Sequence, residues 1–285
     1  MSGFSAEWLA LREPADQRSR APQFSFKIAA RLANLIHAHI VDLGCGTGSN
    51  LRALAPVLSN EQYWRLVDHD PNLLAQARIL LKEWADYAEV KADEFILYYD
   101  DKIIHVHFES HDLRQGLQPL LNQRVDLVTS SALFDLMSAD WIKTMAAELA
   151  QRNILFHTAL SYDGRIQWFP PHRFDEDIQT SFNQHQKSDK GFGLACGPDS
   201  TQTLCTCFSA HGYQCEIADS PWIITRNEEA DLLDQLGNGI AEAAAHTLDD
   251  IQINDWMAAL AGRRSVLIGH QDMIAYPPSP EEDAP

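Results

Sequence analysis

The segment of this chain best suited to bind a ligand is a short apolar run that ends in an acid and passes into three alternating glycines. It reads Ile40-Val41-Asp42-Leu43-Gly44-Cys45-Gly46-Thr47-Gly48-Ser49-Asn50-Leu51. Such a run is typical of a buried parallel strand, and the glycines let the next turn approach a ligand closely. The spacing Gly-x-Gly-x-Gly is neither a dinucleotide fingerprint nor a phosphate loop. The turn therefore suits a nucleoside without phosphate, and Asp42 can accept hydrogen bonds from an ammonium group or from the turn's own amides.

The stretch Val41-Asp42-Leu43-Gly44-Cys45-Gly46-Thr47-Gly48 resembles the first motif of the class I S-adenosylmethionine-dependent methyltransferases. The resemblance implies an α/β fold with a Rossmann-like, seven-stranded, mostly parallel sheet, helices on both faces and an antiparallel last strand. It also implies S-adenosyl-L-methionine as cofactor and S-adenosyl-L-homocysteine as product. An ordinary strand, turn and helix is the alternative, but three further segments lie where this fold needs them.

The first of these segments is a second apolar strand, Tyr63-Trp64-Arg65-Leu66-Val67-Asp68-His69-Asp70-Pro71. Asp68 follows the glycine turn by about twenty residues, the distance expected for a carboxylate that binds a ribose. Pro71 favours the start of a helix, with Asp70 as its N-cap. His69 lies either near the adenine or in a solvent-facing turn.

The second segment alternates between apolar and polar residues from Ile103 to Leu113, which predicts a half-buried strand. In the family, an acid after the third strand binds the adenine amino group, and Asp112 matches it by position. The preceding 94–101 predicts the other arm and turn of a hairpin. His105, His107 and His111 could suggest a metal, but no cysteine or carboxylate cluster accompanies them at ligand spacing, so surface histidines and no metal site are expected.

The third segment, 125–136, is predicted to form the fourth strand, whose carboxyl end faces the cofactor's methyl group. In the N-terminal segment, Arg12 and Arg20 could reach the methionine carboxylate; alternatively, Arg12 pairs with Asp16 one turn later. The residues that the resemblance assigns to cofactor binding are Asp42, Gly44, Cys45, Gly46, Gly48, Asn50, Asp68, His69, Asp112, Leu113, Ser130, Ala132 and Arg20.

A long stretch after the fifth strand, residues 162–198, is where substrate recognition is expected, since long connections often serve as lids or binding loops. Its aromatic and charged candidates for substrate binding are Tyr162, Arg165, Trp168 and Phe192. The candidates for catalysis are His185, Asp135 and Lys190, with His185 as a base that titrates near neutrality. The alternative is a surface insertion without a role in the reaction.

The composition favours an enzyme that acts on small molecules. The formal net charge is -18 and there is no basic run, which argues against nucleic acid and anionic membranes as partners. The five cysteines show neither disulfide nor zinc spacing, and no signal peptide or membrane-spanning run is present. A cytoplasmic protein with reduced thiols is therefore expected.

A single methyltransferase domain is predicted over residues 1–276, followed by a disordered tail at 277–285. Residues 1–36 form a helical cap, interrupted at Pro14 and Pro22. The fifth strand is expected at 152–161, with an irregular stretch from Pro170. The sixth strand is expected at 212–217, a helical insertion at 227–262, and the last strand at 265–270.

The sequence also resembles, in three segments, a bacterial group of class I methyltransferases whose substrate is unassigned. They are Trp8-Leu9-Ala10-Leu11-Arg12-Glu13-Pro14-Ala15-Asp16, Leu160-Ser161-Tyr162-Asp163-Gly164-Arg165, and His185-Gln186-Lys187-Ser188-Asp189-Lys190-Gly191-Phe192-Gly193. The predicted activity is O- or N-methylation of a small molecule. The alternatives are a protein methyltransferase and a protein that binds S-adenosylmethionine without transferase activity.

Overall fold

The computed structural model describes residues 4–91 and 94–278, and most of the predicted tail, 279–285, lies outside this range. Its helices are α1 (Ala6–Ser19), α2 (Pro22–Leu32), α3 (Ser49–Leu54), α4 (Pro71–Trp84), α5 (Ala139–Ala150), α6 (Asp175–Gln186), α7 (Ser200–Ser209), α8 (Arg226–Ala244) and α9 (Asp250–Ala258). Its strands are β1 (Ala38–Leu43), β2 (Glu61–Asp68), β3 (Tyr87–Lys91), β4 (Glu94–Tyr99), β5 (Lys102–Ser110), β6 (Leu127–Ser131), β7 (Leu155–Phe169), β8 (Gln214–Asp219), β9 (Trp222–Thr225) and β10 (Ser265–Tyr276).

The strands form one mixed sheet in the order β3-β4-β5-β2-β1-β6-β7-β10-β8, with β9 paired to the start of β10. Strands β5, β2, β1, β6 and β7 run parallel, and β10 is antiparallel to both of its neighbours in this order, β7 and β8. This is the predicted mostly parallel sheet with an antiparallel last strand. The predicted number of seven strands is too low, because the hairpin arm β4, the outer strand β3 and the short β9 extend the sheet to ten.

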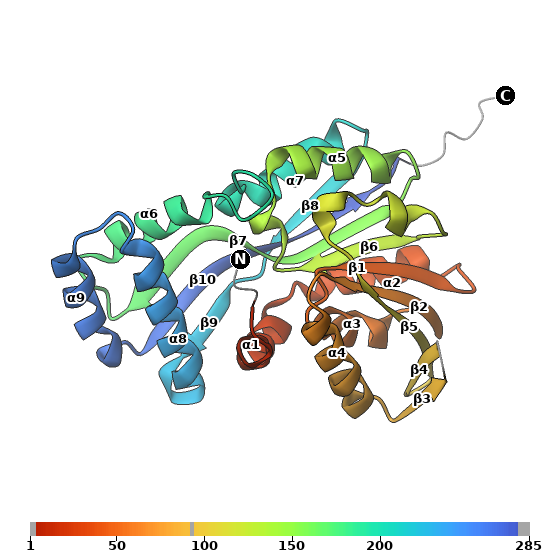
Figure 1. The fold of residues 1–285 in the computed structure, drawn as a ribbon, viewed down its shortest axis with the longest axis horizontal. Coiled ribbons are helices and arrows are strands. Elements are labelled where there is room, and N and C mark those ends of the chain that lie inside the picture. Colours follow the sequence, from red (N-terminus) through yellow and green to blue (C-terminus); the bar gives the residue numbers. More distant parts are fainter. Residues whose placement is uncertain (1–3, 92–93, 279–285) are drawn as a thin grey trace.

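Helices cover both faces of the sheet because successive strand residues point to opposite sides. Ile40 packs with Trp64 and residues of α2, α3 and α4, whereas Val41 packs with Phe156 and residues of α5 and α7. Figure 1 shows these two helical layers on either side of the strands. The continuous burial of β1 from Ile40 to Leu43 follows from this double coverage.

A third apolar core lies where β7 and β10 extend beyond the other strands. It joins Ile166, Trp168 and Val266 to α6, α8 and α9, and forms the part of the molecule on the left in Figure 1. The fifth strand is expected to end at residue 161, but it continues to Phe169 because the long β10 pairs with it antiparallel. The expected irregular stretch from Pro170 is likewise wrong over 175–186, where α6 packs on this core.

The N-terminal helices α1 and α2 meet at Pro22, as predicted, but Pro14 does not interrupt α1. Ser5 caps this helix by accepting a hydrogen bond from the Trp8 amide at 3.1 Å. Farther along, Arg12 and Asp16 form a buried ion pair one turn apart, the alternative considered for Arg12. The N-cap and this ion pair are local interactions that offset the backbone hydrogen bond lost at proline.

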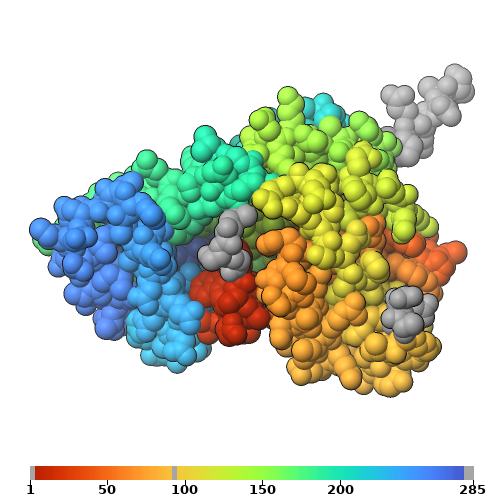
Figure 2. Space-filling view, in the orientation of Figure 1, coloured from red at the N-terminus to blue at the C-terminus, as the bar shows by residue number. Residues whose placement is uncertain are grey.

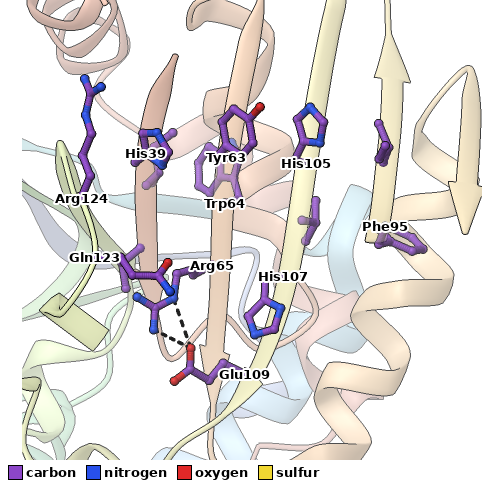
Figure 3. Close-up of a pocket in the computed structure, with 14 residues that line it drawn as sticks. His39, Tyr63, Trp64, Arg65, Phe95, His105, His107, Glu109, Gln123 and Arg124 are labelled. Carbon is purple, nitrogen blue, oxygen red and sulfur yellow. Dashed lines mark hydrogen bonds and ion pairs between the residues drawn. The ribbon is translucent and has the colours of Figure 1, made fainter. Parts of the chain in front are cut away.

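Over β5 and the first residues of β1 and β2, one face lacks a helical cover, because two short 3-10 turns, 113–115 and 118–121, are the only helical elements between β5 and β6. The rings of His39, Tyr63 and His105 stack side by side across this face, with centroids 5.0 and 4.4 Å apart. Figure 3 shows this row and, below it, the ion pair of Arg65 with Glu109. A cavity of about 700 Å³ lies over these side chains.

Candidate functional site

The strand order reverses between β1 and β6, and ligands of open α/β sheets bind outside the carboxyl ends of the strands at such a point. The glycine turn lies here. Gly44, Gly46 and Gly48 adopt φ angles of 62°, 53° and 79°, in the left-handed region that glycine tolerates best. The Cys45 side chain is buried in the core beneath the turn, so its backbone faces the edge of the sheet.

The acid at the end of β1 is fully buried and only half satisfied. Oδ1 of Asp42 accepts a hydrogen bond from Nδ2 of Asn50 at 2.7 Å, whereas Oδ2 has no partner within the described residues. Burial raises the pKa of Asp42 to about 7, although Asn50 and the nearby Arg20 act in the opposite direction. Asp42 therefore does not hold the turn amides, and its free oxygen is suited to a donor such as an ammonium group.

Arg20 reaches the same place from the junction of α1 and α2. It donates hydrogen bonds to Oδ1 of Asn50 at 2.9 Å and to Oγ of Ser131 at 3.1 Å. Its Nε is buried and has no partner in the described part of the chain, and burial lowers its pKa. An unpaired carboxylate oxygen and an unpaired guanidinium nitrogen thus lie close to Asn50 together, which suits the two charged groups of an amino acid.

Asp68 closes the other side of the glycine turn. Its Oδ2 accepts a hydrogen bond from the Gly46 amide at 2.9 Å and its Oδ1 one from the Asp70 amide at 3.0 Å. Each carboxylate oxygen can accept a second bond, so two ribose hydroxyls remain compatible with this arrangement. Asp70 caps α4, as predicted.

Two further candidates for the adenine lie at the ends of β2 and β5. His69 is largely exposed, with Nδ1 3.3 Å from Oδ1 of Asp68. Asp112 binds its neighbour Arg114 through both oxygens, and these hydrogen bonds lower the pKa of Asp112 to about 2. Leu113 is buried below them. The ends of the two strands are joined by a hydrogen bond from the His111 amide to the Asp68 carbonyl.

At the end of β6, the backbone takes a conformation that no sequence signal indicated. Ala132 and Leu160, at neighbouring points of β6 and β7, have φ angles of 51° and 58°. The buried Asp272 holds this arrangement by accepting hydrogen bonds from the amides of Leu160 and Ala21, each at 2.8 Å. Such strain is often found at functional sites. Ser130, by contrast, bonds Thr158 inside the sheet and presents only its backbone toward the edge.

Helix α1 covers the glycine turn from outside. A Cβ at Gly46 would lie 3.0 Å from Cδ1 of Leu9, so this leucine lies directly over the turn. Glu13 accepts hydrogen bonds from Nε and Nη2 of the buried Arg52, whose Nη1 donates to the Thr47 carbonyl at 2.9 Å. Figure 2 shows α1 in red between α8 and the segment that carries α3 and α4.

A cavity of about 470 Å³ lies between α1 and the third core. Most of its walls are apolar or aromatic: Phe4, Trp8, Tyr162, Ile166, Phe182, Trp222, Leu236, Ile240 and Ile268. Of the predicted catalytic and substrate-binding residues, Asp135 and Tyr162 line it. The remaining ones do not: Arg165 pairs with Asp163 and Asp219, Trp168 packs on Trp256, and Phe192 packs on Trp141.

Asp135 follows the bend at Ala132 and lines this cavity. Its Oδ1 is buried without a partner among the described residues, and burial raises its pKa to about 6. Lys190 lies close enough to influence this pKa, and burial lowers the pKa of Lys190 itself. His185 lies near Lys190 but stacks on His246 at 5.1 Å, outside the cavity lining.

The other cavity lies on the open sheet face (Figure 3), and no residue of the glycine turn lines it. Its histidines form no cluster suited to a metal: within residues 4–91 and 94–278, no group of three or more His, Cys, Asp or Glu side chains could hold one. In the same ranges, no helix combines the length and the apolar character that crossing a membrane requires.

The site contains a buried histidine that should make stability depend on pH. His157 bonds Oγ1 of Thr129 at 3.0 Å, and burial lowers its pKa to about 3. The unfolded chain therefore binds more protons between about pH 6.5 and 3, and folding stability should fall as pH falls through this range. We expect His157→Gln to remove this loss. The difference in free energy of unfolding between the variant and the wild type should then change by up to about 1.4 kcal/mol per pH unit.

Denaturant unfolding at several pH values between 7 and 4 measures this difference. Comparison with the variant is necessary because Asp42 and Asp135, whose pKa values are raised, stabilise the fold on acidification. Their effect on stability is opposite to that of His157. His211→Gln, at an exposed position, is the matched control and should follow the wild type. Parallel curves for His157→Gln and the wild type would contradict the assignment.

Comparison with known proteins supports the fold. No protein-family model and no curated protein matches this sequence. Among solved structures, the chain is similar to a cyclopropane-fatty-acyl-phospholipid synthase-like protein from Lactobacillus casei, with a TM-score of 0.54, 14% identity, and coverage of 96% of this chain and 95% of that one. A SAM-dependent methyltransferase from Geobacter sulfurreducens, in complex with S-adenosyl-L-homocysteine, gives a TM-score of 0.44, 15% identity, and coverage of 94% and 98%. The chain thus has a Rossmann-like α/β fold with a mostly parallel sheet, the fold that its sequence resemblance implied.

Proposed function

We propose that this protein is an S-adenosylmethionine-dependent methyltransferase that acts on a small molecule. The observation that carries the proposal is the glycine turn at the switch point, with Asp68 on one side and the unpaired atoms of Asp42 and Arg20 on the other. A ligand with a ribose at one end and an amino acid at the other is complementary to this arrangement. S-adenosylmethionine has both groups and no phosphate.

The residues present fit this molecule. Asp68 would accept the ribose hydroxyls, and Asp112 with Leu113 would lie at the adenine. Oδ2 of Asp42 would accept from the ammonium group, while Arg20 would face the carboxylate. When bound, the cofactor supplies an activated methyl group, and α1 would exclude water from it.

Methylation of an amine or hydroxyl requires the acceptor to lose a proton. Asp135 is the group that we assign to receive it, because it lines the cavity beside α1 and its buried Oδ1 has no partner among the described residues. A raised pKa makes a carboxylate a better base near neutral pH. The proton is then released to solvent. The proximity of the two substrates accounts for the remaining rate enhancement.

The small-molecule assignment rests on the cavity of about 470 Å³, a volume typical of sites for drug-sized ligands. Calorimetry with S-adenosylmethionine, S-adenosylhomocysteine and NAD tests the cofactor. A screen for methyl transfer to metabolite and protein pools then tests the acceptor. Tight binding of NAD alone would contradict the proposal; binding of S-adenosylmethionine without turnover would support a binding protein instead.

The carboxylate of Asp68 gives a specific test of the cofactor's position. We expect Asp68→Asn to weaken S-adenosylhomocysteine binding by about 1–3 kcal/mol, because a charge-assisted acceptor of ribose hydroxyls is lost. Asp70→Asn is the matched control: asparagine caps a helix as well as aspartate does, and its affinity should stay unchanged. Equal affinities of the two variants, measured by calorimetry, would exclude Asp68 as the ribose ligand.

A further inference from the structure

The cavity beside α1 is lined by one carboxylate, Asp135, with a buried oxygen that no described residue satisfies, although Lys190 lies close enough to influence its pKa. Arg12, on its wall, donates two hydrogen bonds to Asp16 at 2.9 and 3.0 Å and lies over the Trp222 ring at 4.8 Å, so its charge is already compensated. His270 is neutral near pH 7, since burial lowers its pKa to about 3. The buried Oδ1 of Asp135, by contrast, lacks any partner in the described residues.

The walls around this carboxylate are those that favour a cation with an apolar body. Trp8, Tyr162, Phe182 and Trp222 contribute aromatic surface to the cavity, and the ring of Tyr162 is packed against Phe182 at 5.6 Å. Aromatic faces attract cations, and a buried carboxylate is costly unless it is paired. A hydroxyl would offset this cost by one neutral hydrogen bond, whereas an ammonium group adds its charge.

The cavity also adjoins the glycine turn through two elements. Leu9 of α1 lies over Gly46 while its neighbour Trp8 lines the cavity. After β6, Leu133 lies 2.9 Å from the position of a Cβ at Gly44, and Asp135 two residues later lines the cavity. A molecule bound at Asp135 would therefore be next to a ligand of the turn.

We propose that this cavity binds the methyl acceptor, that the acceptor is a small amine with an apolar or aromatic body, and that Asp135 pairs with its ammonium group. This inference rests on the proposed function and specifies its substrate class. Carboxylates, phosphates and other anions are excluded, because they would place a second negative charge beside Asp135. Uncharged alcohols are the competing class.

The test uses the full-length protein saturated with S-adenosylhomocysteine, and three probes that differ in one group: phenethylamine, phenethyl alcohol and phenylacetate. Calorimetric titration should show the amine binding roughly tenfold or more tightly than the alcohol, with the acid weakest. Asp135→Asn, which keeps the size of the side chain, should abolish this preference and leave S-adenosylhomocysteine binding unchanged. Asp140→Asn, an exposed position in α5, should behave as the wild type.

A second variant tests the location without touching the carboxylate. Gly239 of α8 lines the cavity, and a Cβ there would meet no atom within 4 Å. We expect Gly239→Phe to block the amine while S-adenosylhomocysteine still binds. Asn238→Phe places the same ring on the adjacent exposed position, which does not line the cavity, and should have no effect.

Three results would overturn the inference: equal affinity for the probes or none, a preference that survives Asp135→Asn, and amine binding that survives Gly239→Phe. Each is read on protein that has bound S-adenosylhomocysteine, so the proposed function stands when the inference fails. Failure of the first titration, with S-adenosylhomocysteine itself, would instead remove the proposed function.

Discussion

Replacing Gly46 with valine is expected to abolish binding of S-adenosylmethionine and S-adenosylhomocysteine. The residue has a φ of 53° and its Cβ position lies 3.0 Å from Leu9, so a branched side chain would strain the turn and push against α1. Its amide also bonds Asp68, and displacement would move the proposed ribose ligand. Calorimetry should show affinity reduced at least ~100-fold, since the loss combines steric exclusion with a displaced charge-assisted acceptor.

The matched control for this prediction is Gly212→Val. Gly212 also has a positive φ, 79°, but it lies in the exposed connection between α7 and β8, where a Cβ would meet only Pro278 at 4.0 Å. Both variants pay a similar backbone penalty of about 1–2 kcal/mol, and only the variant at the turn should lose the ligand. Normal titration by folded Gly46→Val protein would place the cofactor elsewhere.

The second large effect concerns stability. Arg263 is 1% exposed, lies between the rings of Trp168 and Trp256, and donates to Oδ1 of Asp175 at 2.6 Å. Arg263→Met keeps much of the side-chain volume but leaves the largely buried Asp175 without its cation. We expect the free energy of unfolding to fall by about 3–5 kcal/mol, the usual cost of breaking a buried ion pair on one side.

Denaturant unfolding measures this loss, with Arg173→Met as the control. Arg173 pairs with Asp255 at 2.7 Å, but the side chains of the two residues are 70% and 40% exposed. Solvent screens such a pair, so its removal should cost about 0–1 kcal/mol. Similar losses in the two variants would show that Arg263 does not bind the third core together through its charge.

The fold class and the glycine turn could be predicted because the signals are local. The apolar run before Asp42 and the alternation in 103–113 report which strand faces are buried, and the spacing of the glycines reports a turn. The seven strands of the central order were found in this way. Of the three additional strands, β4 is the hairpin arm predicted at 94–101, whereas β9 pairs with the distant β10, and a single strand's pattern does not record such a pairing.

The extension of β7 illustrates the limit. Residues 162–169 were assigned to a substrate-side insertion, yet they alternate between buried and exposed positions as a strand that pairs with β10. Helix α6 begins with three consecutive acids and is largely polar, so its weak apolar periodicity did not indicate a helix. It is stabilised by packing Ile178 against the third core.

The sequence by itself determined the Rossmann-like sheet, the turn at Gly44 to Gly48 and the acids that follow its strands, because periodicity and residue spacing are properties of short segments. The tertiary structure decided which of these groups lack partners. Asp42 and Asp135 are ordinary acids in the sequence; their buried, unpaired oxygens arise only when α1, β6 and the third core exclude water and supply no donor. The burial of a side chain depends on residues that are far apart in the chain, so no local sequence pattern predicts it.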